Sequence, residues 1–277
     1  MIENTGTHIV AVNVTPVRVK PDPDSEQDTQ CTMWQYVNVK DESGAWSLVS
    51  IPFDNTQGWV RSSSLISSDE VDNERLSSAD FAVISSLFAE IRYGPSVSSR
   101  IATKLTIGIQ IPVKKKRGAW TNFILPDNTS CWIKNADIEP IDMSGVMKDV
   151  TTSDAIIYTA ERFVGVPYLW GGVTPFGLDC SGFVQLVYNL NGIRLPRNAN
   201  QQEACEQCKS INLYNIAQGD LLFFAGDSGT IGHVGIALDS DNFIHSCGPR
   251  GVCISKLNSP PYSDMLFSAK RIVYIDV

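Results

Sequence analysis

One segment occurs twice in the first half of the sequence, and this repeat restricts the fold more than any other feature. Gly44-Ala45-Trp46 recurs as Gly118-Ala119-Trp120, and in both copies a second tryptophan follows about a dozen residues later, at Trp59 and Trp132. Short apolar runs separated by Gly, Pro and Asp surround each copy, a pattern typical of short strands joined by turns. Two unequal copies of one small β-barrel or β-sandwich explain the repeat better than chance.

The repeat and a later change of pattern divide the chain into three predicted domains. The two β copies span residues 1–68 and 75–148, and the Ser-, Asp- and Glu-rich segment Ser67–Asp80 between them is typical of a linker. From residue 149 to residue 277, helical patterns come first and strand-like runs follow. Helices followed by antiparallel strands predict an α+β domain.

Two helices are expected at the start of the third domain. The polar segment Thr151–Asp154 supplies N-cap residues for a helix over residues 155–164. A second helix is expected over residues 180–190, with Gly192 beyond its end. The strand-like runs that follow are residues 221–224, 233–238, 242–246 and 271–275.

The charge balance argues against a nucleic-acid partner. The formal net charge is −8, and the basic run Lys114–Arg117 precedes a glycine and is typical of a solvated hairpin turn. No apolar stretch is long enough to span a bilayer. The sequence has no Gly-rich phosphate loop and no cofactor motif, so we expect no cofactor.

Seven cysteines, an odd number without the spacing of a small disulfide scaffold, favour a reducing compartment. The first residues also lack the basic and apolar regions of a secretory signal. We therefore expect a cytoplasmic protein, or a secreted or periplasmic one whose leader was removed before this chain begins. Cys205 and Cys208 form a C-x-x-C pair, but the three histidines offer no second ligand pair at zinc-finger spacing, so no metal site is expected.

A cysteine and two histidines in the third domain have the pattern of a catalytic site. Cys180 lies where the second helix begins, and the positive end of the helix dipole is expected to lower the pKa of its thiol. His233 and His245 lie in consecutive strand-like runs, so a hairpin could let one ring accept the thiol proton while the other orients it. Two strand histidines could equally bind a metal or lie in a core, and a lone cysteine at a helix start is often inert.

Five blocks of this domain resemble the NlpC/P60 family of papain-like cysteine peptidases, which hydrolyse peptidoglycan peptides. In chain order they are Tyr168–Gly172, Leu178–Val184, Leu195–Arg197, Gly219–Phe224 and His233–Ile236. The resemblance implies a helix packed on an antiparallel sheet, with Cys180 as nucleophile, His233 as its base and His245 orienting that base. It also implies that the Cys180 N–H and the Tyr168 hydroxyl stabilise the oxyanion, whereas Trp170 is expected in the core.

The first two domains resemble bacterial SH3-like domains, and the whole chain resembles the γ-D-glutamyl-L-diamino acid endopeptidases of this family. Those enzymes cut between D-Glu and diaminopimelate or lysine in peptides that begin with a free L-Ala amine. The resemblance implies that Asp179 binds this ammonium with help from Ser181, and makes Glu26 of the first domain a candidate second carboxylate for it. The alternatives are that Asp179 is a plain N-cap of the catalytic helix and that Glu26 is a solvated loop acid. Thr56 departs from the pattern, since an aromatic residue is often found there, which puts in doubt how the first domain covers the substrate.

Three functions remain open on this basis. The favoured one is a monomeric peptidase of cell-wall recycling, whose partner is an L-Ala-γ-D-Glu-diamino acid peptide. The second is a secreted lysin that cuts intact peptidoglycan and uses the SH3-like domains as wall anchors; acyltransferases and amidases of related fold share the same Cys–His chemistry. A non-enzymatic wall-binding protein is the least favoured, because an inert domain has no need of Cys180, His233 and His245 together.

Overall fold

The computed structural model describes residues 6–71, 80–141, 152–226 and 229–273. The chain forms two compact units, residues 1–146 and 147–277. Residues 72–79, in the middle of the expected linker, lie outside the described ranges. Within those ranges, no helix combines the length and the apolar character that a bilayer crossing requires.

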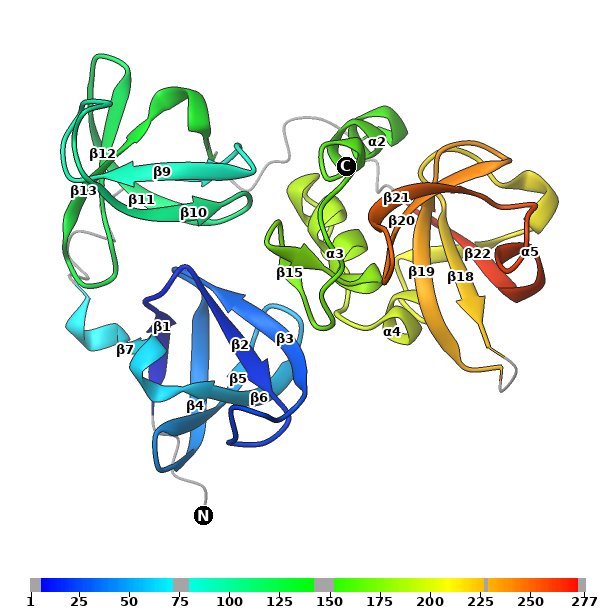
Figure 1. The fold of residues 1–277 in the computed structure, drawn as a ribbon, viewed down its shortest axis with the longest axis horizontal. Helices are drawn as coiled ribbons and strands as arrows, with labels where there is room; N and C mark the ends of the chain where they lie inside the picture. Colours follow the sequence, from blue (N-terminus) through cyan, green and yellow to red (C-terminus); the bar gives the residue numbers. More distant parts are fainter. Residues whose placement is uncertain (1–5, 72–79, 142–151, 227–228, 274–277) are drawn as a thin grey trace. The chain divides into compact units, whose positions relative to one another are not determined.

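The first sheet of the N-terminal unit has seven antiparallel strands in the order β3-β2-β6-β5-β4-β1-β7 (Figure 1). These strands are β1 (Thr7–Val10), β2 (Val14–Arg18), β3 (Gln27–Thr32), β4 (Tyr36–Ser43), β5 (Trp46–Ile51), β6 (Thr56–Arg61) and β7 (Leu65–Ser67). Val17, Val37, Val49 and Val60 are buried together in its core. Alternation of buried and half-exposed residues along β2 and β6 is what a sheet with one face packed on a core requires.

The second sheet repeats this strand order, with every strand moved seven places along the chain: β10-β9-β13-β12-β11-β8-β14. Its strands are β8 (Asp80–Ile84), β9 (Phe88–Arg92), β10 (Ile101–Thr106), β11 (Gln110–Arg117), β12 (Trp120–Ile124), β13 (Ser130–Lys134) and β14 (Ile138–Pro140). The repeat seen in the sequence therefore corresponds to one β topology used twice, as predicted.

The repeated Gly-Ala-Trp segments form the same turn in the two sheets. Gly44 joins β4 to β5 and Gly118 joins β11 to β12, and both have a φ of 59°, which residues with a Cβ rarely adopt. Each turn places a tryptophan at the start of the following strand. Trp46 and Trp120 are buried in this way, with 6% and 9% of their surfaces exposed.

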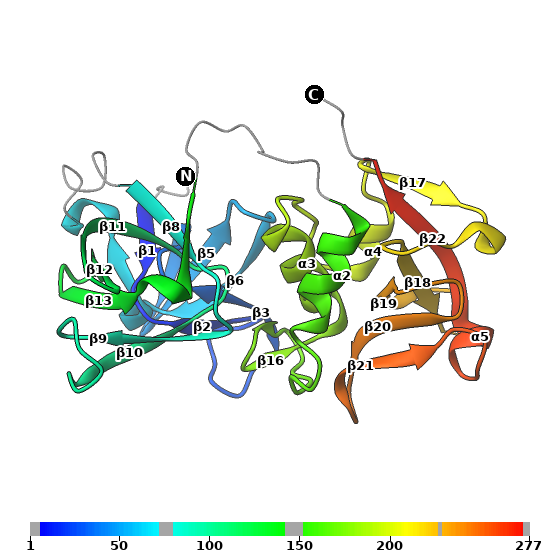
Figure 2. The same ribbon diagram turned by 90° about the horizontal axis from the view of Figure 1, so that it is seen from above.

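The C-terminal unit is built on an antiparallel sheet with the strand order β17-β22-β18-β19-β20-β21 (Figures 1 and 2). Its strands are β17 (Cys208–Ile211), β18 (Leu221–Ala225), β19 (Ile231–Ala237), β20 (Asn242–Cys247), β21 (Gly251–Lys256) and β22 (Leu266–Ile272). The other elements are α2 (Ser153–Glu161), β15 (Val173–Thr174), β16 (Gly177–Leu178), α3 (Cys180–Leu190), α4 (Ala199–Glu203) and α5 (Tyr262–Met265). Helix α3 contacts both β19 and β20. The α+β class expected from the order of elements is confirmed.

Local sequence explains where α3 begins and ends. The Asp179 carboxylate accepts a hydrogen bond from the Gly182 N–H at 2.6 Å, which makes Asp179 the N-cap. Phe183 and Val187 lie one turn apart and are fully buried. Gly192 has a φ of 79° just beyond the helix, a conformation typical of a residue that ends one.

Three expectations about the C-terminal unit are corrected. Helix α2 ends at Glu161 rather than near Val164, because a turn follows and Gly165 has a φ of 88°. Trp170 was expected in the core, but 60% of it is exposed. Strand β21 was not predicted, because its sequence, GVCISK, carries no clear apolar alternation.

Candidate active site

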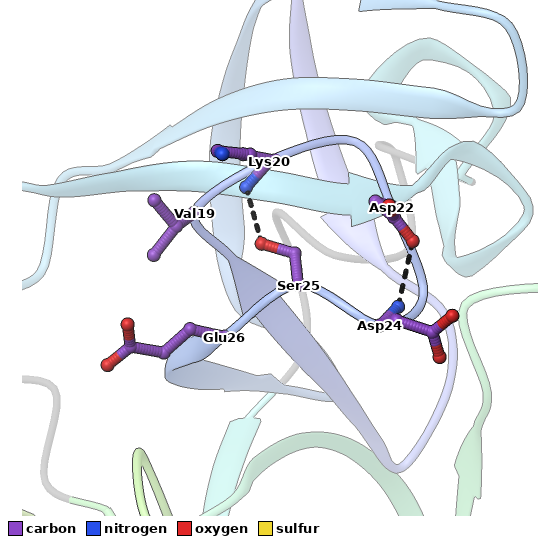
Figure 3. Close-up of a pocket in the computed structure, with 6 residues that line it drawn as sticks. All are labelled: Val19, Lys20, Asp22, Asp24, Ser25 and Glu26. Atoms are coloured by element: carbon purple, nitrogen blue, oxygen red, sulfur yellow. Dashed lines mark hydrogen bonds between the residues drawn. The ribbon is translucent and has the colours of Figure 1, made fainter.

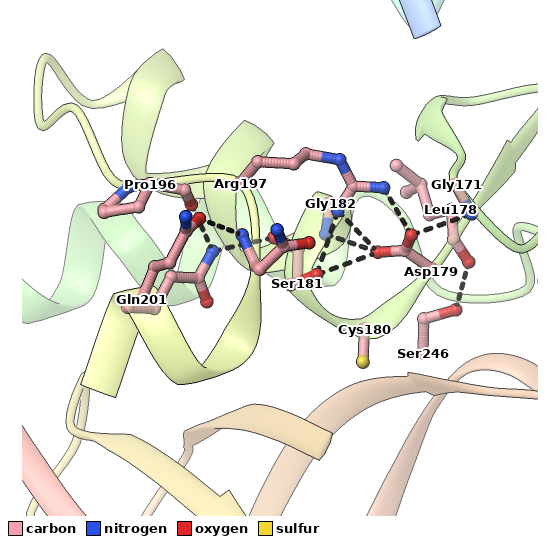
Figure 4. A network of polar contacts seen from close by, with 12 residues as sticks. Gly171, Leu178, Asp179, Cys180, Ser181, Gly182, Pro196, Arg197, Gln201 and Ser246 are labelled. Atoms are coloured by element: carbon pink, nitrogen blue, oxygen red, sulfur yellow. Dashed lines mark hydrogen bonds and ion pairs between the residues drawn. The ribbon is translucent and has the colours of Figure 1, made fainter. Parts of the chain in front are cut away.

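Cys180 is the first residue of α3, and its thiol points away from the polar network at that end of the helix (Figure 4). The Sγ atom lies 4.0 Å from the carbonyl oxygen of Gly232, the residue before His233. The thiol therefore lies beside the strand that carries the first histidine. Among the described residues, the thiol and the His233 imidazole are not hydrogen-bonded to each other.

The Cys180 thiol is protonated near neutral pH. Only 9% of the residue is exposed. Burial, reinforced by the Asp179 carboxylate, raises the pKa of the Cys180 thiol to about 11, and nearby backbone N–H groups oppose this only in part. The expectation that this pKa is lowered is therefore wrong, because removal from water and the Asp179 carboxylate raise it more than the Val234 and Ser181 N–H groups lower it. A base is needed before this sulfur can act as a nucleophile.

His233 and His245 face each other from neighbouring strands. The His233 Nε2 is 2.7 Å from the His245 Nδ1, and the ring planes meet at 85°. Strands β19 and β20 pair so that Ile236 lies opposite Ile244, which puts both histidines on the same face of the sheet. Burial lowers the pKa of His233 to about 4, and burial together with His233 and Arg250 lowers the pKa of His245 to about 3. Both rings are therefore neutral near pH 7.

A glycine on β19, Gly235, leaves space for the two histidine rings. Gly235 precedes Ile236, which pairs with Ile244, and a Cβ at Gly235 would be 3.1 Å from the His245 Cβ. The same Cβ would be only 2.7 Å from the Phe243 Cδ2, closer than carbon atoms pack. The Phe243 ring in turn stacks on the His245 ring, with centroids 4.5 Å apart. The His233-Val234-Gly235 segment thus supplies one histidine and the space for the other.

Two residues that the sequence did not indicate continue this hydrogen-bonded chain. The His245 Nε2 is 2.9 Å from the Ser255 Oγ, and the Arg250 Nη2 donates to the same oxygen at 2.8 Å. Ser255 lies on β21, opposite Phe243 in the β20–β21 register, and so on the face that carries His245. Only the register of this hairpin identifies Ser255, because the sequence gives no motif around it.

Asp179 and Ser181 belong to a buried network held by an arginine (Figure 4). Arg197, with 2% of its surface exposed, forms an ion pair with the Asp179 carboxylate and donates to the Ser181 Oγ at 2.9 Å. The carboxylate also accepts hydrogen bonds from the N–H groups of Gly171 and Gly182 and from the Ser181 hydroxyl. In all it accepts five hydrogen bonds, two of them from Arg197.

Tyr168 lies next to β16 and near the start of α3. It forms an isolated bridge with Leu178 and is half-buried. Burial, followed by the nearby Cys180 and Asp179, raises the pKa of the Tyr168 hydroxyl to about 12. The hydroxyl therefore keeps its proton near neutral pH and can donate a hydrogen bond.

Glu26 lies in the N-terminal unit, in the loop between β2 and β3. This loop lines a small pocket of about 350 Å³, formed by Val19, Lys20, Asp22, Asp24, Ser25 and Glu26. Figure 3 shows the Glu26 carboxylate directed away from the Asp22 and Asp24 carboxylates. Glu26 and Asp179 belong to different units, and joint binding of an amine by the two stays a prediction.

Comparisons with known families agree with the folds of both units. Residues 165–271 match the NlpC/P60 family, and residues 17–65 match the bacterial dipeptidyl-peptidase Sh3 domain. These matches and the antiparallel sheet packed on α3 define a papain-like cysteine peptidase. More narrowly, the chain belongs to the NlpC/P60 family.

Individual relatives match either most of the chain or about half of it. A γ-D-glutamyl-L-lysine dipeptidyl-peptidase of Bacillus cereus is 27% identical over 256 residues, which are 88% of this chain and 74% of that protein. The murein DD-endopeptidase MepS/murein LD-carboxypeptidase of Escherichia coli is 34% identical over 134 residues, 48% of this chain and 69% of that protein. The crystal structure of an NlpC/P60 family protein from Bacillus cereus, 23% identical, superimposes with a TM-score of 0.86 over 96% of this chain and 99% of that one.

Proposed function

We propose that this chain hydrolyses the bond between γ-D-Glu and a diamino acid in peptides derived from peptidoglycan. The observation that carries the proposal is the His233–His245 hydrogen bond beside a buried cysteine at a helix start. One relative that extends over most of this chain is named as a γ-D-glutamyl-L-lysine dipeptidyl-peptidase, and the Sh3 match is to a domain of bacterial dipeptidyl-peptidases. The cysteine and the histidine pair suit peptide hydrolysis in general, and the two matches to dipeptidyl-peptidases favour this particular bond.

The proposed mechanism begins with proton transfer from Cys180 to His233. The His233 Nε2 faces His245, so Nδ1 is the nitrogen that accepts the thiol proton. The sulfur then attacks the peptide carbonyl, and the protonated His233 gives its proton to the leaving amine as the C–N bond breaks. A water molecule that loses a proton to His233 then cleaves the thioester and regenerates the Cys180 thiol. Because burial raises the thiol pKa to about 11, Cys180 depends on His233 to become a nucleophile.

The hydrogen bonds around His245 define which tautomer this mechanism needs. A protonated His233 donates through Nε2, so the His245 Nδ1 must accept. The His245 proton is then on Nε2, where it is donated to the Ser255 Oγ. His245 is in this way a positioning residue, because it fixes the orientation of His233 without touching the substrate.

The negative charge that develops on the carbonyl oxygen needs donors close to Cys180. We assign this part to the Cys180 N–H, at the start of α3, and to the Tyr168 hydroxyl, whose pKa of about 12 keeps it protonated. Preorganised donors of this kind contribute about 2.7–4 kcal/mol each in other hydrolases.

The requirement for a free N-terminal L-Ala, and with it a role in cell-wall recycling, is a further part of the proposal. Asp179, Ser181 and Glu26 are the candidate partners of that ammonium. The Asp179 carboxylate already accepts five hydrogen bonds, so a substrate ammonium has to share or replace one of them. The monomeric state inferred from the sequence stays a prediction, as does the location, cytoplasmic or, if a leader was removed, secreted or periplasmic.

Mass spectrometry of reaction products tests the proposal. Wild type and Cys180→Ala are incubated with L-Ala-γ-D-Glu-diaminopimelate, with its N-acetylated form, with the lysine analogue and with intact sacculi. We expect wild type alone to release L-Ala-γ-D-Glu, and to cleave the acetylated peptide about 10- to 100-fold less efficiently, the effect of losing one charge-assisted hydrogen bond. Equal cleavage of both peptides, with solubilised sacculi, favours a lysin that acts on the intact wall.

A further inference from the structure

Three metal-binding side chains gather on the β20–β21 hairpin, and the proposed peptidase chemistry uses only one of them. The sulfurs of Cys247 and Cys253 are 3.6 Å apart, and the Cys253 Sγ is 3.8 Å from the His245 Nε2. All three ligand atoms lie within 4.8 Å of one another. His245 is buried, whereas both cysteines are half-buried, so the cluster can be reached from solvent through its sulfurs.

Two of the three separations fit a tetrahedral metal ion, and the third lies within 4.8 Å. Zinc binds a thiolate at about 2.3 Å and an imidazole nitrogen at about 2.0 Å, so neighbouring ligand atoms are then about 3.5–3.8 Å apart. The two measured separations, 3.6 Å and 3.8 Å, agree with these values. We propose that His245, Cys247 and Cys253 form a binding site for a thiophilic divalent ion such as Zn²⁺, and that the bound ion inhibits the peptidase.

Charge and proton balance are compatible with such an ion. Each thiol releases its proton to solvent on binding, and the two thiolates neutralise a divalent cation. The Arg250 guanidinium, which donates to Ser255 next to this cluster, therefore faces a complex without net charge. Water takes the fourth position of a tetrahedral ion with three protein ligands.

A disulfide is the competing explanation for two sulfurs 3.6 Å apart, and the strand register argues against it. His245 lies opposite Cys253 and Cys247 lies opposite Gly251, so the two cysteines are diagonal neighbours. Diagonal positions have Cα atoms about 7–8 Å apart, whereas a disulfide needs about 4.4–6.8 Å. Chelation of an ion replaces the hydrogen bond from the His245 Nε2 to Ser255 but keeps the strand pairing, and a disulfide requires the backbone to move.

The inhibition follows from the tautomer that the ion imposes on His245. An ion on Nε2 forces the proton onto Nδ1, so His245 donates to the His233 Nε2 instead of accepting from it. A neutral His233 then carries its proton on Nδ1, the nitrogen that has to accept the Cys180 proton. This consequence rests on the proposed function, whereas the binding of the ion does not.

Cadmium titration of Cys180→Ala tests the binding site without the reactive thiol. We expect one Cd²⁺ per chain, with the ultraviolet charge-transfer absorption of a cadmium thiolate. In the same background, Cys247→Ser/Cys253→Ser should lose this absorption. The matched control Cys205→Ser/Cys208→Ser, which removes the C-x-x-C pair, should keep it. Absorption that persists in the first variant, or is absent from Cys180→Ala, overturns the proposal.

Inhibition is measured with Zn²⁺ in the presence of a non-thiol reductant, on a chain with Cys180 intact. We expect Zn²⁺ to inhibit wild type and a chelator to restore it. Cys247→Ser/Cys253→Ser should remain active and be more than about 100-fold less sensitive, since even outer-shell changes cost about 10- to 100-fold in metal affinity. Inhibition that appears only with an oxidant assigns the pair to a disulfide and overturns the proposal. A chain that binds Cd²⁺ but cleaves no peptide contradicts the proposed function alone.

Discussion

The His233 Nε2 lies 2.7 Å from the His245 Nδ1, and this hydrogen bond makes the state of one ring depend on the other. Both rings are neutral near pH 7, because burial lowers the pKa of His233 to about 4 and that of His245 to about 3. Each ring then has one proton. Only when both rings are protonated on Nε2 is the His233 Nδ1 free to accept the proton of Cys180. The Ser255 Oγ, 2.9 Å from the His245 Nε2, favours that arrangement by accepting the proton at the far end.

Loss of the base should cost more than loss of the residue that orients it. We expect His233→Ala to lower kcat by about 10²- to 10⁴-fold, the usual contribution of a general base. His245→Asn keeps an oxygen that accepts from His233 and should lower kcat much less. Steady-state kinetics on L-Ala-γ-D-Glu-diaminopimelate measures both effects. A fully active His233→Ala enzyme contradicts the assignment.

Ser255 is expected to act on catalysis as a positioning residue. Ser255→Ala removes the partner of the His245 Nε2, and we expect kcat to fall about tenfold, the equivalent of one hydrogen bond of about 1.4 kcal/mol, with KM unchanged. Ser255→Thr retains the hydroxyl and should retain the activity. A purely structural role predicts lower stability in both variants and no rescue by threonine.

Gly235→Ala tests whether the space between the strands positions His245. The added Cβ would lie 2.7 Å from the Phe243 Cδ2 and 3.1 Å from the His245 Cβ, so the Phe243 ring, which stacks on the histidine, has to shift. We expect kcat to fall by more than about tenfold. Gly226→Ala is the control, because a Cβ there meets no atom within 4 Å. Equal activity of the two variants would show that the imidazole tolerates displacement.

The parts of the fold that the sequence could predict depend on local patterns. The start of α3 at Cys180 follows from an Asp N-cap and an apolar helical face, and the twin β sheets follow from the repeated Gly-Ala-Trp turn. The chemistry of Cys180 and its histidines came instead from the resemblance, because a cysteine at a helix start has no unique meaning by itself.

What the sequence could not predict depends on contacts between distant segments. The Arg197–Asp179 pair joins a helix start to a loop, and the contact of Ser255 with His245 depends on the register of β20 and β21. The pKa of Cys180 was expected to fall and rises instead, because burial depends on the whole domain. The sequence does not predict the cluster of His245 and two thiols for the same reason. Residues on two paired strands can lie close together without the sequence spacing of a zinc finger.

The buried Arg197–Asp179 pair should be a main determinant of the stability of the C-terminal unit. Arg197→Met leaves the Asp179 carboxylate buried without its cation, and we expect a loss of about 3–5 kcal/mol in the free energy of unfolding. Asp179→Asn/Arg197→Met removes the uncompensated charge and should recover part of this loss. Urea denaturation of the single and double variants measures it. Additive effects of the two substitutions would mean that the ion pair contributes little.

Stability should also fall on mild acidification, with a contribution from the histidine pair. In the folded chain His233 and His245 resist protonation down to pH values of about 4 and 3, whereas an unfolded histidine takes up a proton near pH 6.5. Between these limits the unfolded state binds more protons than the folded state, so the free energy of unfolding decreases as pH decreases from about 6.5 to about 4.

His245→Asn removes one of the two groups and should make this decrease shallower. His8→Gln, which replaces the histidine of the N-terminal unit, is the control for a general effect of removing an imidazole. Urea midpoints at several pH values across the window compare the three proteins, and a pH dependence that is identical in wild type and His245→Asn would rule out the histidine pair as its source.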